Sequence, residues 1–260
     1  MKEVVKTCAY CATINGDEVD HLLARQLFPP EARFRDGLPQ VPACGACNRL
    51  KQRAEDTVGV LLQFGHPSEA SQRVLESRVP RTLKKNHRLG RALRAGVERV
   101  TVRRDSGLVV DGLGIRLGSS ELAHIHDWFC LVTRGLYRFE AGIPLPADHS
   151  VSLIRPTSRR QCEVLISLLC RDSQHSHRSF ASGEFRYVFA VARVDPISGW
   201  FYSFKSVDMF AVTMGPTAPP ESVRSTAELA WQRPEVDFHP LGAPGGRLAS
   251  GGFRQTSNST

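Results

Sequence analysis

The stretch CGACNRLK at residues 44–51 repeats the cysteine spacing of CAYC at residues 8–11, and 32 residues separate the two pairs. Two residues between cysteines allow both thiolates of a pair to point into one tight turn, and four thiolates complete a tetrahedral zinc site. Such a site leaves no position open to water and is therefore structural. Because so short a module has little core of its own, zinc binding is expected to drive its folding. We expect Zn2+ to be held by Cys8, Cys11, Cys44 and Cys47.

A redox centre of the thioredoxin type is the alternative for these cysteines. It is disfavoured because two pairs are present and no βαβ pattern surrounds them. Disulfides are disfavoured as well, because the first ten residues lack the apolar region of a signal peptide and the protein is expected in the reducing cytoplasm. No run approaches the roughly 18 apolar residues of a membrane helix, so no membrane association is expected. The other cysteines, Cys130, Cys162 and Cys170, have apolar neighbours and are expected in the core.

Residues suited to phosphodiester hydrolysis lie inside and directly after the cysteine frame. Asp20 and His21 are adjacent between the two pairs, and Asn48 follows the last cysteine. The unperturbed pKa of histidine, near 6.5, makes His21 the best candidate for a general base that activates water. Asp20 and Asn48 offer the hard oxygen atoms that Mg2+ or Mn2+ prefers. Such an ion would act as a Lewis acid and stabilise the leaving alkoxide.

The order C-x2-C, DH, C-x2-C-N, x-x-K over residues 7–57 resembles the zinc-containing branch of the HNH endonuclease family. The resemblance implies a ββα-metal unit, a two-stranded hairpin followed by a helix, with Asp20, His21 and Asn48 as its active-site core. It also implies that the first strand ends near His21, since adjacent side chains within a strand point to opposite faces. Many members place an asparagine about five residues before the third cysteine, where this chain has Pro39 followed by Gln40.

The charge of the chain is concentrated in one segment. The net charge is +8, and residues 66–104 carry 11 Lys and Arg against 3 Asp and Glu, which accounts for the whole excess. This concentration indicates one positive face and a polyanionic partner, although a solvated amphipathic helix is the alternative. We expect nucleic acid, with DNA favoured by the family resemblance. The residues expected to contact its backbone are Arg49, Lys51, Arg53, Lys84, Lys85, Arg88 and Arg91.

Hydrophobic periodicity predicts an α+β fold with a substantial core, since 41% of the residues are hydrophobic. Expected helices cover residues 47–64, one or two helices within 68–95 broken near Pro80, residues 119–139 and residues 158–171. Expected strands cover residues 97–117, 149–155, 184–194 and 199–213. His175 and His177 are expected in a polar loop, and the aromatic residues of 119–139 in the core.

These elements predict four segments. A zinc module of HNH type spans 1–65, a basic helical connector 66–104, an α+β domain of unknown role 105–215, and a largely disordered tail rich in Pro, Gly and Ser 216–260. The predicted function is a metal-dependent endonuclease. The alternatives are a zinc-dependent nucleic-acid-binding protein without catalysis and a regulator whose C-terminal domain binds protein. The joint presence of Asp20, His21 and Asn48 favours the enzyme, because a binding module has no need of the Asp-His pair.

Overall fold

The computed structural model describes residues 6–28, 37–64, 69–103, 108–156, 158–171, 175–191, 197–205 and 207–216. The described chain is an α+β fold that begins with a strand, a strand and a helix, as predicted. The tail predicted to be disordered lies outside the described residues beyond residue 216. No helix in the described ranges is long and apolar enough to cross a membrane.

The N-terminal unit is a short antiparallel hairpin followed directly by a helix. Strand β1 (Glu18–His21) pairs with β2 (Gln40–Ala43), with His21 opposite Gln40, and a 3-10 turn η1 (Arg25–Leu27) lies between them. Helix α1 (Gly45–Leu61) starts immediately after β2. Its N-cap residue is Cys44, in extended conformation, so the second cysteine pair is placed at the start of the helix. Strand β1 ends at His21.

Three helices, rather than one or two, make up the basic segment: α2 (Glu69–Ser77), α3 (Val79–Lys85) and α4 (His87–Ala95). Pro80 lies in the first turn of α3, where a residue without a backbone N–H is tolerated. Asn86 ends α3 and caps α4, because its side chain accepts a hydrogen bond of 3.0 Å from Leu89 N. The basic side chains expected on one continuous helical face are therefore divided between α3 and α4.

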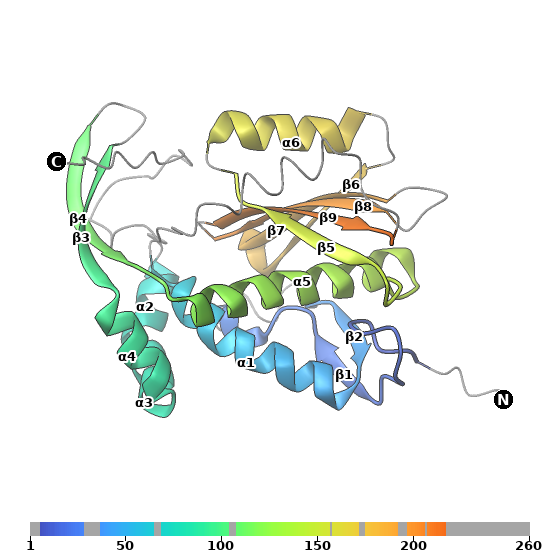
Figure 1. Ribbon diagram of the computed structural model, residues 1–260, viewed down its shortest axis with the longest axis horizontal. Helices are drawn as coiled ribbons and strands as arrows, with labels where there is room; N and C mark the ends of the chain where they lie inside the picture. Colours follow the sequence, from blue (N-terminus) through green and yellow to red (C-terminus); the bar gives the residue numbers. More distant parts are fainter. Residues whose placement is uncertain are drawn as a thin grey trace.

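The C-terminal part is built on an antiparallel sheet with strand order β5-β9-β8-β7-β6. Before the sheet come the ribbon β3 (Val97–Arg103) and β4 (Val109–Ile115) and the long helix α5 (Ser119–Ala141). The sheet comprises β5 (Ser150–Ile154), β6 (His175–Phe180), β7 (Phe185–Val191), β8 (Ser198–Phe204) and β9 (Val207–Met214). Helix α6 (Arg159–Arg171) covers one face of the sheet, and α5 covers the other (Figure 1).

Two predictions about this sheet were wrong. The predicted strand 199–213 is two strands, because the chain reverses at Lys205, whose φ is 55°. His175 and His177, predicted in a loop, lie in strand β6 instead, with His177 exposed. A charged residue in left-handed conformation and a polar edge strand carry little hydrophobic signal, so pattern alone misses both.

One continuous core joins the N-terminal unit to the C-terminal part. Buried side chains of the cysteine turn, the hairpin, α5 and the inner face of the sheet form a single cluster. Phe28 and Trp128, for example, both pack against Phe204 of the sheet, with ring centroids 5.5 and 5.8 Å away. Smaller clusters join the end of α1 to α3 and α4, and α6 to the outer face of the sheet. The segments 1–65 and 105–215, expected as separate units, thus pack together, and Figure 1 shows α1 lying alongside α5.

Candidate functional site

The four predicted zinc ligands lie together. The Sγ atoms of Cys8, Cys11, Cys44 and Cys47 are all within 4.8 Å of one another. A zinc tetrahedron with Zn–S of about 2.3 Å has sulfur–sulfur edges of about 3.8 Å, so this cluster can hold a metal such as zinc. Four thiol ligands leave no position for water, so the metal would be structural. Among the described residues, this is the one group of three or more His, Cys, Asp or Glu side chains whose ligand atoms lie close enough together to hold a metal ion.

Local backbone geometry explains how the cysteines converge. The turn after Cys8 is closed by hydrogen bonds from Cys8 N to Ile14 O (2.8 Å) and from Ala12 N to Cys8 O (3.0 Å). Burial raises the pKa of the Cys8 thiol. Burial acts in the same direction on Cys11, but hydrogen bonds from Thr13, Ile14 and Cys8 together lower the pKa of Cys11 to about 6. A metal at this cluster would displace any remaining thiol protons, because the thiolate is the ligand form.

Strand β1 and helix α1 face each other through two polar pairs. Glu18 and Asp20 are two residues apart on β1, and Asn48 and Lys51 are one turn apart on α1. Asn48 Nδ2 donates to Glu18 Oε2 at 2.5 Å, and Lys51 Nζ lies 3.0 Å from Asp20 Oδ2. Asp20 and Asn48, predicted to share a divalent ion, therefore lie in neighbouring pairs. Among the described residues, no direct contact joins them.

Lys51 is the centre of a buried polar network. Its ammonium bonds Glu55 Oε1 at 2.5 Å and the backbone oxygen of His21 at 2.8 Å, in addition to Asp20. Tyr10 Oη donates to Asp20 Oδ2 at 2.5 Å. Lys51 is fully buried, with 0% of its surface exposed, so the nucleic-acid contact expected of it does not fit this position. Burial raises the pKa of Glu55, and the positive charge of Lys51 opposes that shift.

His21 stands at the end of β1 with its ring against the side chain of its cross-strand partner. Gln40 Nε2 lies 3.2 Å from His21 Nε2 and 3.4 Å from Nδ1. The side chain of Gln40 thus contacts the ring of His21 across the hairpin. Burial, and then the positive charge of Arg25, lower the pKa of His21 from 6.5. The imidazole is therefore neutral at neutral pH and can accept a proton.

Three residues of this site were missed by the sequence analysis: Tyr10, Glu18 and Glu55. Glu18 shares the face of β1 with Asp20, and its alternation with exposed Val19 is a signal that could have placed it. Glu55 lies one turn after Lys51, which is the spacing of a helical ion pair. Tyr10 carried no such signal, because its contact with Asp20 depends on the turn of the cysteine pair.

The basic residues lie at the far end of α1 from the cysteine cluster, on α3 and α4 (Figure 1). Val60 and Leu61 of α1 pack against Val79, Leu89 and Leu93 of these helices. From Asn48 to Val60 the helix rises about 18 Å. Every basic side chain predicted to bind nucleic acid, other than Lys51, is exposed: Arg49, Arg53, Lys84, Lys85, Arg88 and Arg91.

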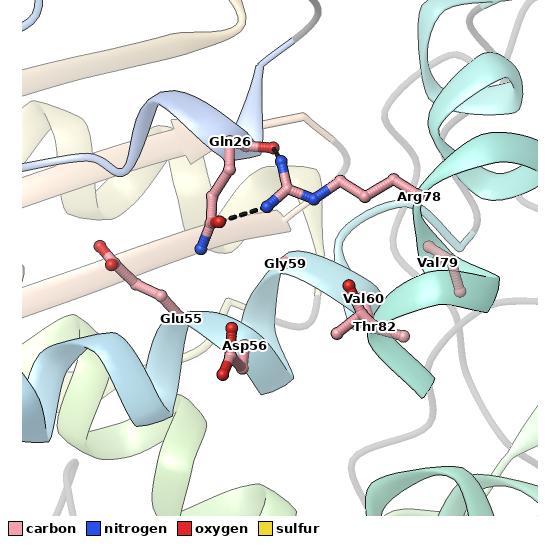
Figure 2. Close-up of a pocket in the computed structure, with 8 residues that line it drawn as sticks. All are labelled: Gln26, Glu55, Asp56, Gly59, Val60, Arg78, Val79 and Thr82. Carbon is pink, nitrogen blue, oxygen red and sulfur yellow. Dashed lines mark hydrogen bonds between the residues drawn. The ribbon is translucent and has the colours of Figure 1, made fainter. Parts of the chain in front are cut away.

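A shallow hollow lies halfway along α1, where η1 approaches α3. Figure 2 shows Arg78 reaching across it to Gln26; Arg78 Nη1 donates to Gln26 O at 2.8 Å, and Nη2 donates to Gln26 Oε1. Glu55 of the buried network lines this hollow, but Asp20, His21 and Asn48 do not. The hollow thus marks the junction of the hairpin with the basic helices, not the predicted active site.

Two histidines of α5, His124 and His126, lie against neighbouring side chains. His124 Nδ1 lies 2.8 Å from Thr57 Oγ1 and so ties α5 to α1, while His126 lies near Cys130. Trp128 and Phe129 are buried in the core, as predicted.

A scan against protein-family models and searches of curated proteins and of solved structures find no match to this chain.

Proposed function

We propose that this chain is a metal-dependent endonuclease of HNH type, which hydrolyses phosphodiester bonds of nucleic acid. One observation carries the proposal: Lys51 of α1 contacts both Asp20 and the backbone oxygen of His21, so the end of β1 lies against the helix that also carries Asn48. In a unit that served only to bind nucleic acid, an Asp-His pair at a strand end and an Asn in the facing helix would have no required role.

His21 acts as the general base in this proposal. Its neutral ring accepts the proton of the attacking water, and Gln40 holds the ring in place. Lys51 binds the backbone oxygen of His21, which fixes the end of the strand against α1.

Asp20 and Asn48 would hold the catalytic cation, Mg2+ or Mn2+. Their carboxylate and amide oxygens are suitable donors, and two protein ligands are enough because Mg2+ usually keeps several of its waters. The ion supplies Lewis acidity at the scissile phosphate. The Asn48 amide nitrogen donates to Glu18, so the Asn48 amide oxygen points away from Glu18.

Nucleic acid is the substrate class that fits the charge distribution. The exposed Lys and Arg side chains of α3 and α4 would bind the phosphate backbone, while the site at the start of α1 cleaves it. Such contacts are largely independent of sequence and sensitive to salt. DNA is favoured over RNA by the family resemblance alone.

The test is a cleavage assay with the zinc-loaded chain. Supercoiled plasmid, single-stranded DNA and RNA are incubated with Mg2+, with Mn2+ and without either ion. We expect cleavage of at least one substrate that requires the added ion. If the chain binds nucleic acid in a salt-sensitive manner but cleaves none of the substrates, it is a non-catalytic nucleic-acid-binding protein and this proposal is wrong.

A further inference from the structure

Both recorded contacts of the Asp20 carboxylate fall on the same oxygen. Tyr10 Oη and Lys51 Nζ lie 2.5 and 3.0 Å from Oδ2, and among the described residues no hydrogen bond reaches Oδ1. The side chain is not sealed from solvent, because 12% of its surface stays exposed. Both contacts thus hold one oxygen of Asp20, and no hydrogen bond from a described residue reaches the other.

Lys51 is held as firmly as the carboxylate that it binds. The Lys51 ammonium donates hydrogen bonds to the oxygen of His21 and to Glu55 Oε1, and it forms an ion pair with Asp20 Oδ2. Glu55 also balances the charge of the ammonium at 2.5 Å. With both carboxylates ionised, Lys51, Asp20 and Glu55 together carry one net negative charge, which favours a cation beside them.

Tyr10 is fixed from behind by helix α5. A Cβ atom built on Gly135 would lie 3.1 Å from Tyr10 Cε1 and 2.0 Å from Leu22 Cδ2, so the backbone of α5 contacts both side chains closely. Tyr10 itself is 2% exposed. The hydroxyl that meets Asp20 thus belongs to a ring that cannot move without moving the core.

We propose that Tyr10 and Lys51 are positioning residues, which fix Oδ2 of Asp20 and so present Oδ1 to a divalent cation. This inference rests on the proposed function, since it assigns the cation of that same site. Residues that hold a metal ligand from behind commonly change metal affinity or activity by about 10- to 100-fold when they are replaced. The competing interpretation is a closed ion pair with a structural role only.

Tyr10→Phe is the informative variant, because it removes one hydroxyl and keeps the buried ring. Replacement of Lys51 would leave Glu55 buried without its partner, which risks unfolding the chain. Tyr202→Phe is the matched control: Tyr202 lies in the same core, and its hydroxyl donates to Thr133 Oγ1 at 2.9 Å. Melting temperature and zinc content establish that both variants are folded.

The measurement is Mn2+ binding to the full, zinc-loaded chain, followed by the electron paramagnetic resonance signal of free Mn2+, together with the rate of cleavage. We expect Tyr10→Phe to raise the dissociation constant of Mn2+ about 10-fold or more, and Tyr202→Phe to leave it unchanged. In an Asp20→Asn background, Tyr10→Phe should have no further effect, because the oxygen it fixes is no longer a carboxylate.

Two results would overturn the inference in distinguishable ways. If the wild type binds Mn2+ and cuts nucleic acid but Tyr10→Phe behaves like Tyr202→Phe, positioning by Tyr10 is wrong and the proposed function stands. If the wild type does not bind Mn2+, or if Asp20→Asn binds Mn2+ as tightly as the wild type, Asp20 is not a cation ligand. The inference and the proposed metal-dependent function then fail together.

Discussion

Cys44 combines two structural tasks in one residue. It is the N-cap residue of α1 and also one of the four clustered thiols, and 4% of its surface is exposed. A metal bound at this cluster would therefore fix the start of the helix that carries Asn48 and Lys51. The bond between the metal and Cys44 would thus both stabilise the N-terminal unit and set the position of those two side chains.

Replacing Cys44 by Ala should release the metal and unfold the N-terminal unit. Structural zinc contributes roughly 10–16 kcal/mol of apparent binding free energy to small modules, and loss of one of four thiolates forfeits a large share of it. Zinc content by mass spectrometry and a thermal melt measure the effect, with Cys162→Ala as the control, because Cys162 lies outside the cluster. A Cys44→Ala chain that retains one zinc ion and melts like the control would contradict this role.

The cysteine cluster was predictable because it depends only on spacing, whereas the surroundings of Lys51 were not. A lysine three residues after Asn48 looks like a solvated helix residue until the facing strand supplies Asp20 and the oxygen of His21. Long-range partners of this kind leave no trace in local periodicity. Lys51 was therefore predicted to contact phosphate, whereas it lies buried between Asp20 and Glu55. The candidate catalytic residues Asp20, His21 and Asn48 are the same as those predicted.

At the scale of elements, α5 is the support of the candidate site. It packs along α1 and contacts the hairpin through Gly135, where no side chain separates the helix from Leu22 and Tyr10. Leu22 directly follows His21, and Tyr10 binds Asp20. A substitution on α5 that displaces Leu22 or Tyr10 should therefore also displace Asp20 and His21, although α5 does not contact that pair through Gly135.

Gly135→Ala should disturb the site from a distance. The new methyl group would lie 2.0 Å from Leu22 Cδ2, and overpacking of this kind typically costs about 1–3 kcal/mol. We expect a lower melting temperature and reduced cleavage. The matched control is Gly90→Ala on α4, where the nearest atom lies 3.5 Å away and alanine favours the helix. If both variants were equally stable and active, α5 would not support the site as described.

Boundaries of elements were predictable where pattern and cap agree. Ser158 accepts a hydrogen bond of 3.2 Å from Gln161 N at the start of α6, as expected of a cap. At α5 the N-cap residue is Gly118 rather than a serine, and the Glu121 side chain accepts a hydrogen bond of 3.1 Å from the Gly118 N–H. The break at Asn86 was missed, since an asparagine can continue a helix or cap the next one.

At the scale of the whole molecule, charge and packing are organised separately. The core runs from the cysteine turn through α5 to the sheet, while the basic side chains lie on α3 and α4, at one end of α1. Composition predicted the charged segment. It could not predict the shared core, because burial of Phe28 against Phe204 is decided only when distant segments pack.

Charge reversal on α4 should weaken nucleic-acid binding across all sequences. Arg88→Glu with Arg91→Glu removes two exposed cations, and each lost phosphate contact should reduce the slope of log K against log salt by about 0.9. Binding of a labelled duplex at several salt concentrations, without added Mg2+ or Mn2+, measures this slope. Arg160→Glu, exposed on α6, is the control. If the Arg88→Glu, Arg91→Glu double variant had the same slope as the wild type, α4 would not be part of the binding surface.

The rate of plasmid cleavage by the His21→Ala chain tests the central claim most directly. It is measured with Mg2+ or Mn2+ beside the wild type and His177→Ala, which alters an exposed histidine of β6. Loss of a general base typically costs about 100- to 10,000-fold, so we expect that reduction for His21→Ala, with zinc content unchanged and full activity in His177→Ala. Cleavage by His21→Ala at the wild-type rate would contradict the assignment of this site as a nuclease centre.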